Sequence, residues 1–378
     1  MNKYLCFLFK ISIFIWLNLK KTFMKPLIYY TLFTIFFIIG CSNKKSKSLN
    51  FTIQQITIAP EPVTNNSISI ATINKDSYLF SFGGLDSTKL YSGIHQRSFR
   101  YDFKNKKWLQ LANLPDSLGK IASAASLIKD TIYIIGGYHV FKDGNEISSN
   151  KVHRYAVKSN QFLDDGNPIP TAIDDHVQAV WRDSLIYVVT GWSQKENVAD
   201  VQIYNPYKNS WKIGSPVPNT HDYKSFGANG IIVEDTIFYF GGAAMGKNFP
   251  IQSILRKGVI NVNNPIEISW STINLDSTST SYRMAATKVL NTPHFIGGSA
   301  NTYNFNGISY NKTGGVSPNR TGFAYKNNKM YKYYNKLLPM DLRGLASLND
   351  TIKYMYGGME ENQKVSNKIL QLSWTTKH

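Results

Sequence analysis

A pair of adjacent glycines recurs along this 378-residue chain, and its regular spacing restricts the possible folds more than any other feature. Each pair ends a short run rich in β-branched and aromatic residues. Five copies are Gly-Gly and one is Thr-Gly: Gly83-Gly84, Gly136-Gly137, Thr190-Gly191, Gly241-Gly242, Gly297-Gly298 and Gly357-Gly358. Successive copies are 53, 54, 51, 56 and 60 residues apart. Self-similarity at a fixed period of this length indicates a repeat architecture built from one supersecondary unit.

Each copy also carries the signals of several antiparallel strands. In five copies an Asp stands before the run that ends in the doublet, where a tight hairpin turn is expected. These residues are Asp76, Asp130, Asp183, Asp235 and Asp350. Beyond the doublet come a polar loop and another strand, and in three copies two aromatic residues stand seven positions apart. The pairs are Tyr101 and Trp108, Tyr155 and Phe162, and Tyr204 and Trp211. The pattern predicts an all-β chain of six similar units.

The unit resembles the kelch repeat, in which Gly-Gly follows an apolar strand and precedes a Tyr-x-Pro turn and a Trp, as in Tyr204-Asn205-Pro206 and Trp211. The resemblance covers about residues 51–374 and implies a six-bladed kelch-type β-propeller, with four strands in each blade. The fifth copy departs most, with Thr292-Pro293 at its turn and a long loop over 299–319. We expect residues 51–59 to add the outermost strand to the last blade and so to close the ring.

Residues 1–40 contain five lysines and no acid, and they end in an apolar run over 27–39 followed by Gly40-Cys41. This segment resembles a bacterial lipoprotein signal, which implies Cys41 as the lipid attachment site and a membrane-anchored protein of the cell envelope, on the periplasmic or surface face of the outer membrane. The alternative is a plain amino-terminal membrane helix. We expect a signal segment over 1–40, a flexible tether over 41–50 and the propeller over 51–378. Because Met24 begins a complete signal by itself, we interpret residues 1–23 as the product of an upstream start codon.

Composition excludes several classes of site. The chain has two cysteines, too few for a disulfide scaffold, a four-cysteine zinc site or a cysteine-ligated cluster. No cysteine follows position 41, so the Tyr–Cys crosslink of galactose-oxidase-like propellers cannot form. The seven histidines are scattered singly, and we therefore expect no metal and no cofactor. The net charge is +18, but the basic residues are dispersed, so we do not expect nucleic acid as a partner.

The kelch resemblance implies a ligand site at the channel mouth, where repeats of this family often carry an Arg before the inner strand. Arg283 and Arg343 match that position, and His176 takes it in the third copy. Lys224 lies nearby in the fourth copy, and Tyr223 and Tyr282 offer flat faces for stacking. Convergent basic groups would suit an anionic ligand. The alternative for each basic residue is a pairing with an Asp on its own rim.

Three functional hypotheses follow. The first is a non-catalytic binding or interaction module for an anionic glycan or a protein loop. The second is a sugar mutarotase or epimerase of the sialic acid mutarotase type, an isomerase implied by a distant resemblance to that periplasmic six-bladed propeller. It requires a carboxylate beside an Arg, and the weak catalytic candidates are Glu360, Glu361 and Arg343. The third is a structural subunit of an envelope assembly.

Overall fold

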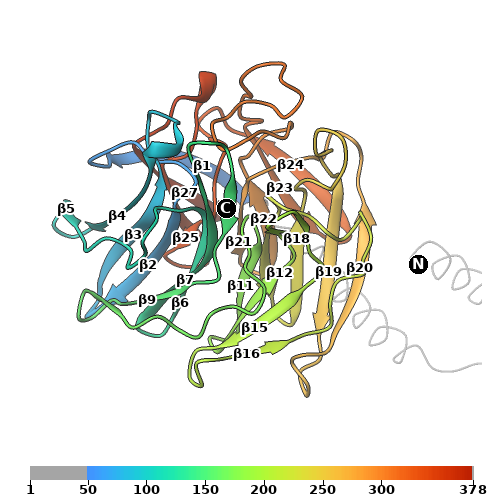
Figure 1. Cartoon of the computed structure of the whole chain (residues 1–378), viewed down its shortest axis with the longest axis horizontal. Helices are drawn as coiled ribbons and strands as arrows, with labels where there is room; N and C mark the ends of the chain where they lie inside the picture. The colour runs from blue at the N-terminus through green and yellow to red at the C-terminus, as the bar shows by residue number, and fades with distance from the viewer. Residues whose placement is uncertain (1–48, 377–378) are drawn as a thin grey trace, which may run out of the picture. The chain divides into compact units, whose positions relative to one another are not determined.

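The computed structural model describes residues 49–376, and its strands form six four-stranded antiparallel sheets arranged around a common centre (Figure 1). Each sheet is one blade. In five blades the four strands follow one another along the chain from the innermost to the outermost. The six-bladed β-propeller predicted from the repeats is therefore confirmed.

The strand bounds are similar from blade to blade. Blade 1 contains β2 (Ser67–Ile73), β3 (Asp76–Leu85), β4 (Ile94–Asp102) and β5 (Lys107–Gln110), with the 3₁₀ helix η1 (Tyr91–Gly93). Blade 2 contains β6 (Ile121–Ile128), β7 (Thr131–Val140), β9 (Val152–Ala156) and β10 (Gln161–Leu163), and β8 (Glu146–Ser148) pairs with β7. Blade 3 contains β11 (Val177–Trp181), β12 (Leu185–Val189), β15 (Val201–Asn205) and β16 (Ser210–Ile213), with a small hairpin of β13 (Trp192–Ser193) and β14 (Glu196–Asn197).

The second half of the ring repeats this order. Blade 4 contains β17 (Asn229–Val233), β18 (Thr236–Phe240), β19 (Ile254–Ile260) and β20 (Ile268–Asn274). Blade 5 contains β21 (Ala285–Val289), β22 (Thr292–Ile296), β23 (Thr321–Lys326) and β24 (Lys329–Tyr334). Blade 6 contains β25 (Ala346–Ser347), β26 (Ile352–Tyr356) and β27 (Lys368–Thr376), with the 3₁₀ helix η2 (Glu361–Gln363).

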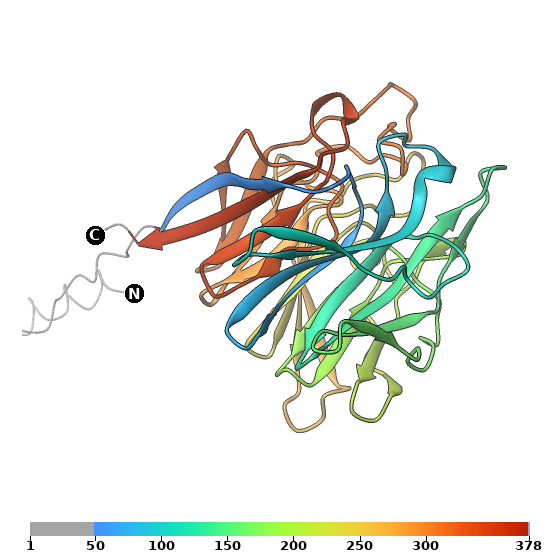
Figure 2. The same ribbon diagram turned by 90° about the vertical axis from the view of Figure 1, so that its left-hand side faces the viewer.

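The fourth strand of blade 6 comes from the other end of the propeller. The sheet order is β1-β27-β26-β25, where β1 spans Leu49–Ile58, and Figure 2 shows β1 running alongside β27. The ring of Phe51 lies 4.9 Å from that of Trp374, and the Ala59 N–H donates to the Asn367 carbonyl at 2.7 Å. The predicted closure is confirmed, with β1 beginning two residues before position 51.

The signal segment over 1–40, Cys41 and nearly all of the expected tether lie outside the described residues. Among residues 49–376, no helix has the length and apolar character needed to cross a membrane.

The glycine doublets fasten each blade to the next. In five blades the N–H of the second glycine donates to a carbonyl of the following blade, as from Gly242 to Ser281 at 2.9 Å. The first glycine has a positive φ, and a Cβ at Gly241 would lie 2.1 Å from that Ser281 carbonyl oxygen. Only glycine permits both the left-handed backbone and the close approach. In blade 3 the hydroxyl of Thr190 makes the link instead, to the backbone of Ser225.

In three blades, a pair of aromatic side chains packs across the two outer strands. Tyr101 faces Trp108 directly across the β4–β5 hairpin, and the two equivalent pairs face each other across β9–β10 and β15–β16. The ring centroids in these pairs lie 5.0, 5.0 and 4.8 Å apart. Cross-strand aromatic pairs of this kind stabilise a sheet. The residues seven apart in the sequence therefore meet because a turn separates two facing positions.

Six equivalent residues, each at the start of an innermost strand or shortly before it, form a ring around the propeller axis. We call Asn65, Ala122, Asp175, Gly227, Arg283 and Asp341 the axial ring. All six have a positive φ, between 45° and 64°. Their backbones are joined by hydrogen bonds from blade to blade, for example from the Arg283 N–H to the Gly227 carbonyl at 2.7 Å; in blade 6 the donor is Leu342. The ring positions the side chains of the candidate site.

Candidate functional site at the axial ring

Four side chains of the axial ring, those of Asn65, Asp175, Arg283 and Asp341, are linked by hydrogen bonds. Arg283 donates from Nη2 and Nε to Oδ2 of Asp175, at 2.6 and 3.1 Å, and from Nη1 to Oδ1 of Asp341, at 3.3 Å. Arg283 also donates to the hydroxyl of Tyr138 at 3.2 Å. Asp341 in turn accepts hydrogen bonds from Asn65 and from the Thr64 hydroxyl. Arg283 and Asp175 are each 1% exposed, so the ion pair is fully buried.

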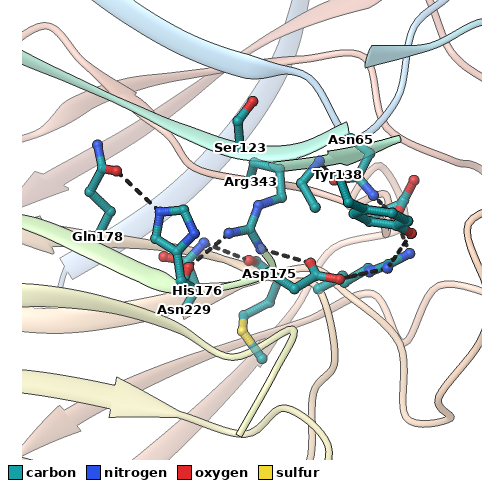
Figure 3. A network of polar contacts seen from close by, with 12 residues as sticks. Asn65, Ser123, Tyr138, Asp175, His176, Gln178, Asn229 and Arg343 are labelled. Carbon is teal, nitrogen blue, oxygen red and sulfur yellow. Dashed lines mark hydrogen bonds and ion pairs between the residues drawn. The ribbon is translucent and has the colours of Figure 1, made fainter. Parts of the chain in front are cut away.

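Arg343 reaches the same carboxylate from the other side. Its Nη1 donates to Oδ1 of Asp175 at 3.0 Å, and its Nη2 donates to the backbone carbonyl of His176 at 2.7 Å. Figure 3 shows the Arg343 guanidinium between Asp175 and His176, with Gln178 bonded to the far side of the imidazole. Asp175 therefore accepts from two guanidinium groups that come from blades 5 and 6.

Burial determines the protonation of the groups around this network. Burial, together with the positive charge of Arg343, lowers the pKa of His176 to about 3, so its imidazole is neutral at pH 7. Burial raises the pKa of Asp341, although the Arg283 charge opposes the shift. Burial and the neighbouring Asp175 charge raise the pKa of Asp174 well above its usual range. Partial desolvation by the surrounding loops also raises the pKa of Glu146, although its side chain is exposed.

A small cavity lies beside the network, and we call it the central pocket. Its volume is about 90 Å³. Its lining comes from blades 2 to 5: Tyr138, Glu146, Asp174, Asp175, Trp192, Phe226, Phe249, Arg283, Asn304 and Tyr310. The aromatic members pack against one another, with the Phe249 ring 5.7 Å from that of Trp192 and 4.7 Å from that of Tyr310. The pocket thus combines aromatic walls with carboxyl groups and one guanidinium.

The network corrects the expectation of a cationic funnel. Arg283, Arg343 and His176 do come together, as predicted. However, both guanidinium groups are already paired with aspartates, and the imidazole is held neutral. The alternative prediction was that each basic residue pairs with an Asp on its own rim. The arginines do pair with aspartates, but these partners, Asp175 and Asp341, come from other parts of the sequence. These arginines therefore offer no unpaired positive charge to an anion.

The other predicted binding residues lie elsewhere. Lys224 lines a separate surface pocket with Glu196 and Asp200. The carbonyl of Tyr223 accepts a hydrogen bond from the Tyr239 hydroxyl, and its side chain packs against a core cluster between blades 3 and 4. Tyr282 is 0% exposed and packs edge-on against Phe226 and Tyr303, so its face is not free to stack on a ligand.

Of the three catalytic candidates, Arg343 belongs to the axial network, whereas Glu360 and Glu361 lie in a different place. Glu360 pairs with Lys368 at 2.8 Å, and Glu361 pairs with Arg320 at 2.6 Å. Both glutamates line a pocket at the loops of blades 5 and 6. The carboxylates within hydrogen-bond reach of the arginines are Asp175 and Asp341, which the sequence pattern did not single out.

A difference in register explains why Asp341 escapes the sequence pattern. Arg283 and Arg343 each stand 14 residues before the first glycine of their doublets, at Gly297 and Gly357. In the structure the ring residue of blade 6 is Asp341, which stands 16 residues before Gly357. Blade 6 therefore has two more residues than blade 5 in this interval. In the structure, an isolated β-bridge marks five of the six ring positions. It joins the residue before the ring position to the residue after the doublet, as between Tyr282 and Ser299.

No group of three or more His, Cys, Asp or Glu side chains within residues 49–376 is arranged to hold a metal ion. The central pocket places three carboxyl groups beside an arginine, an arrangement that orients polar ligands and can move protons.

Comparison with known proteins agrees with the fold. A family model described as the KLHDC2/KLHL20/DRC7 Kelch-repeats domain matches residues 45–242, more than half of the chain. Kelch-like protein 40 of Xenopus laevis is 27% identical over 158 residues, covering 41% of this chain and 24% of that protein. Kelch-like protein terF of Aspergillus terreus is 25% identical over 168 residues, covering 42% and 35%. The chain thus matches only a quarter to a third of the length of these curated relatives.

Among solved structures, the structure of YjhT is similar to this one, with a TM-score of 0.67 and 17% sequence identity. The match covers 85% of this chain and 99% of YjhT. At this identity the likeness concerns the fold alone. The family match shows that the chain belongs to the kelch-repeat family.

Proposed function

We propose that this kelch-repeat propeller is a non-catalytic binding module of the cell envelope, which takes one group of a larger ligand into the central pocket. The observation that carries the proposal is the pocket lining, in which Trp192, Phe249 and Tyr310 stand together with Glu146 and Asp174. Aromatic walls with a few convergent polar groups are the common composition of ligand sites.

The size of the pocket limits what enters it. Whole drug-sized ligands occupy cavities of roughly 300–1,000 Å³. The central pocket has about 90 Å³, room for about three water molecules. We therefore infer that it receives a single end group of a glycan or a protein loop, while the rest of the ligand contacts the surrounding loops.

Binding can be tested with the purified full-length chain on an array of glycans and peptides. We expect at least one ligand class to bind, and Trp192→Leu to weaken that binding at least about tenfold, a loss of about 1.4 kcal/mol. Tyr331→Leu is the matched control, because Tyr331 is 50% exposed on β24 and lies outside the pocket lining. Equal binding by both variants and the wild type would show that the pocket is not the binding site.

A second candidate function is sugar mutarotation, and one observation favours it. Asp174 and Glu146 are carboxyl groups of raised pKa that share a pocket with Arg283. A general acid works best when its pKa lies near the operating pH. NMR exchange spectroscopy with acidic and neutral sugars measures anomer interconversion directly. The mutarotase hypothesis requires acceleration that Asp174→Asn abolishes; no acceleration at high protein concentration excludes it.

The envelope location rests on the Gly40-Cys41 step after the apolar run. Intact mass analysis of the protein from a bacterial host should show a chain that begins at an acylated Cys41. Cys41→Ser should leave the precursor uncut and without lipid. An unmodified chain that retains residues 1–40 would contradict the lipoprotein proposal.

A further inference from the structure

The charges around the central pocket are unequal. Four carboxyl groups, those of Glu146, Asp174, Asp175 and Asp341, surround two guanidinium groups, those of Arg283 and Arg343. Both arginines pair with Asp175, and Arg283 also pairs with Asp341. If all four acids were ionised, the group would carry two more negative than positive charges.

Two of these acids form no ion pair among the described residues. Asp174 is 3% exposed, and its Oδ2 accepts one hydrogen bond, from the Ser148 hydroxyl at 2.6 Å. Glu146 is an exposed residue on β8 that lines the same pocket. The pKa values of both groups are raised, so at a given pH they carry less negative charge than ordinary carboxyl groups would.

Apart from Asn304, the rest of the lining is aromatic. Trp192, Phe226, Phe249 and Tyr310 come from three blades, and the three closest pairs among their ring centroids are 4.7, 5.3 and 5.4 Å apart. Aromatic residues grouped around a cavity recognise ammonium groups, because the ring faces carry negative charge density. A cavity of about 90 Å³ suits a head group of that size better than a sugar ring with its substituents.

We propose that the central pocket binds an alkylammonium group, held by the aromatic side chains of its wall and by the carboxylates of Glu146 and Asp174. The proposal rests on the proposed binding function, whose ligand it assigns to a chemical class. An entering cation favours the ionised carboxylates of Glu146 and Asp174, both of which have raised pKa values. Binding therefore releases protons, and the affinity rises with pH.

The other charged and titratable groups at the pocket do not change the expected rise of cation affinity with pH. Asp175 and Arg283 face each other as an ion pair, and Asp341 and Arg343 belong to the same buried network. Tyr138 and Tyr310 line the pocket, and burial raises the pKa of both hydroxyls, so they stay neutral at pH 5 to 8. Glu146 and Asp174 are the groups left to titrate against the ligand.

The experiment compares charged probes with uncharged probes of the same shape. Choline is paired with 3,3-dimethyl-1-butanol, and ethanolamine with n-propanol. Binding is followed by NMR through the indole N–H resonance that Trp192→Phe removes. We expect dissociation constants in the millimolar range for such small probes. In at least one pair the cation should bind at least about tenfold more tightly than its neutral counterpart, and more tightly at pH 8 than at pH 5.

Two variants test whether Glu146 and Asp174 bind the cation. Glu146→Gln keeps the size of an exposed side chain and should weaken the cation about tenfold, and Asp174→Asn should do the same if it folds. Asp130→Asn is the control, because Asp130 is an exposed carboxylate of the same blade, in the turn between β6 and β7. Equal affinities within both probe pairs, or no effect of Glu146→Gln, would overturn the proposal.

The array experiment separates this proposal from the one on which it rests. If Trp192→Leu abolishes binding of an array ligand that neither choline nor ethanolamine displaces, the cation proposal fails and the binding function stands. If no array ligand depends on Trp192 and no cation binds, both fail.

Discussion

At the scale of single residues, the Asp175 carboxylate joins the two arginines of the site. It accepts hydrogen bonds from Arg283 and Arg343, and no other acid contacts both guanidinium groups in the described part of the chain. Buried ion pairs are not strongly stabilising in themselves, because desolvation offsets the attraction. Their cost appears when one partner is removed and the other charge stays buried.

Asp175→Asn should therefore lower the free energy of unfolding by about 3–5 kcal/mol, because it leaves two buried guanidinium groups with only the Asp341 carboxylate. Urea denaturation measures the loss. Asp130→Asn is the matched control: it breaks an exposed pair with Lys158 and should cost less than about 1 kcal/mol. Similar losses in the two variants would mean that the network does not depend on Asp175.

His176 predicts a specific pH dependence of stability. Its pKa falls from 6.5 to about 3 on folding, so between these values the unfolded chain binds a proton that the folded chain does not. Stability must then decrease as the pH falls from 6.5 toward 3, by up to about 1.4 kcal/mol per pH unit for this one group. His176→Gln should flatten the decrease by about that amount in urea titrations at pH 6.5, 5.5 and 4.5. His221→Gln, at an exposed site, should leave the slope as it is in the wild type.

At the scale of elements, the glycine doublets decide how closely the blades approach. Gly357 has φ of +71°, and a Cβ there would lie 2.0 Å from the carbonyl oxygen of Val63 in blade 1. Blade 3 shows that the position tolerates a side chain when the surroundings adapt, since Thr190 occupies it with φ of +44°. The requirement for glycine therefore comes from the neighbouring carbonyl as well as from the backbone angle.

Gly357→Ala separates these two causes when compared with Gly144→Ala. Gly144 has φ of +83°, and a Cβ added there would have no heavy atom within 4 Å, so its substitution should cost only the backbone strain of about 1–2 kcal/mol. Gly357→Ala adds a collision and should cost clearly more in the same denaturation experiment. If both variants lose equal stability, the contact with Val63 is not limiting.

At the scale of the whole molecule, stability depends on joining the two ends of the propeller. Strand β1 supplies the outermost strand of blade 6, and the Ile58 carbonyl accepts a hydrogen bond from the Trp108 indole of blade 1 at 2.8 Å. The first and last blades are thus linked through one short segment. Without it, β27 would present an unpaired edge.

Deletion of residues 51–59 from the full-length chain should remove the cooperative thermal transition or lower its midpoint by many degrees. Circular dichroism at increasing temperature measures this. Phe51→Ala is the milder comparison, because it removes the ring contacts with Tyr333 and Trp374 but keeps the backbone of β1. A deletion variant that melts as the wild type does would show that closure by β1 is not needed.

The sequence alone predicted the features that repeat in each unit. It did not predict side-chain contacts between residues that are far apart in the chain. The doublets predicted six blades, and the aromatic pairs predicted facing strands, because both are set by spacing within one unit. Tyr282 was expected to face a ligand, but Phe226 and Tyr303 from other segments cover it. Asp175 and Asp341 were missed because their partners lie 108 and 58 residues away from them in the sequence, at Arg283.

The axial ring has one more consequence. Its backbone hydrogen bonds run from blade to blade, while its side chains differ: the chain carries Asn, Ala, Asp, Gly, Arg and Asp at the six positions. All six residues are buried, and a Cβ at Gly227 would lie 2.2 Å from the Tyr282 ring, so each side chain has to fit its neighbours. Substitutions at these positions are therefore coupled, and their effects on stability should not add when two are combined.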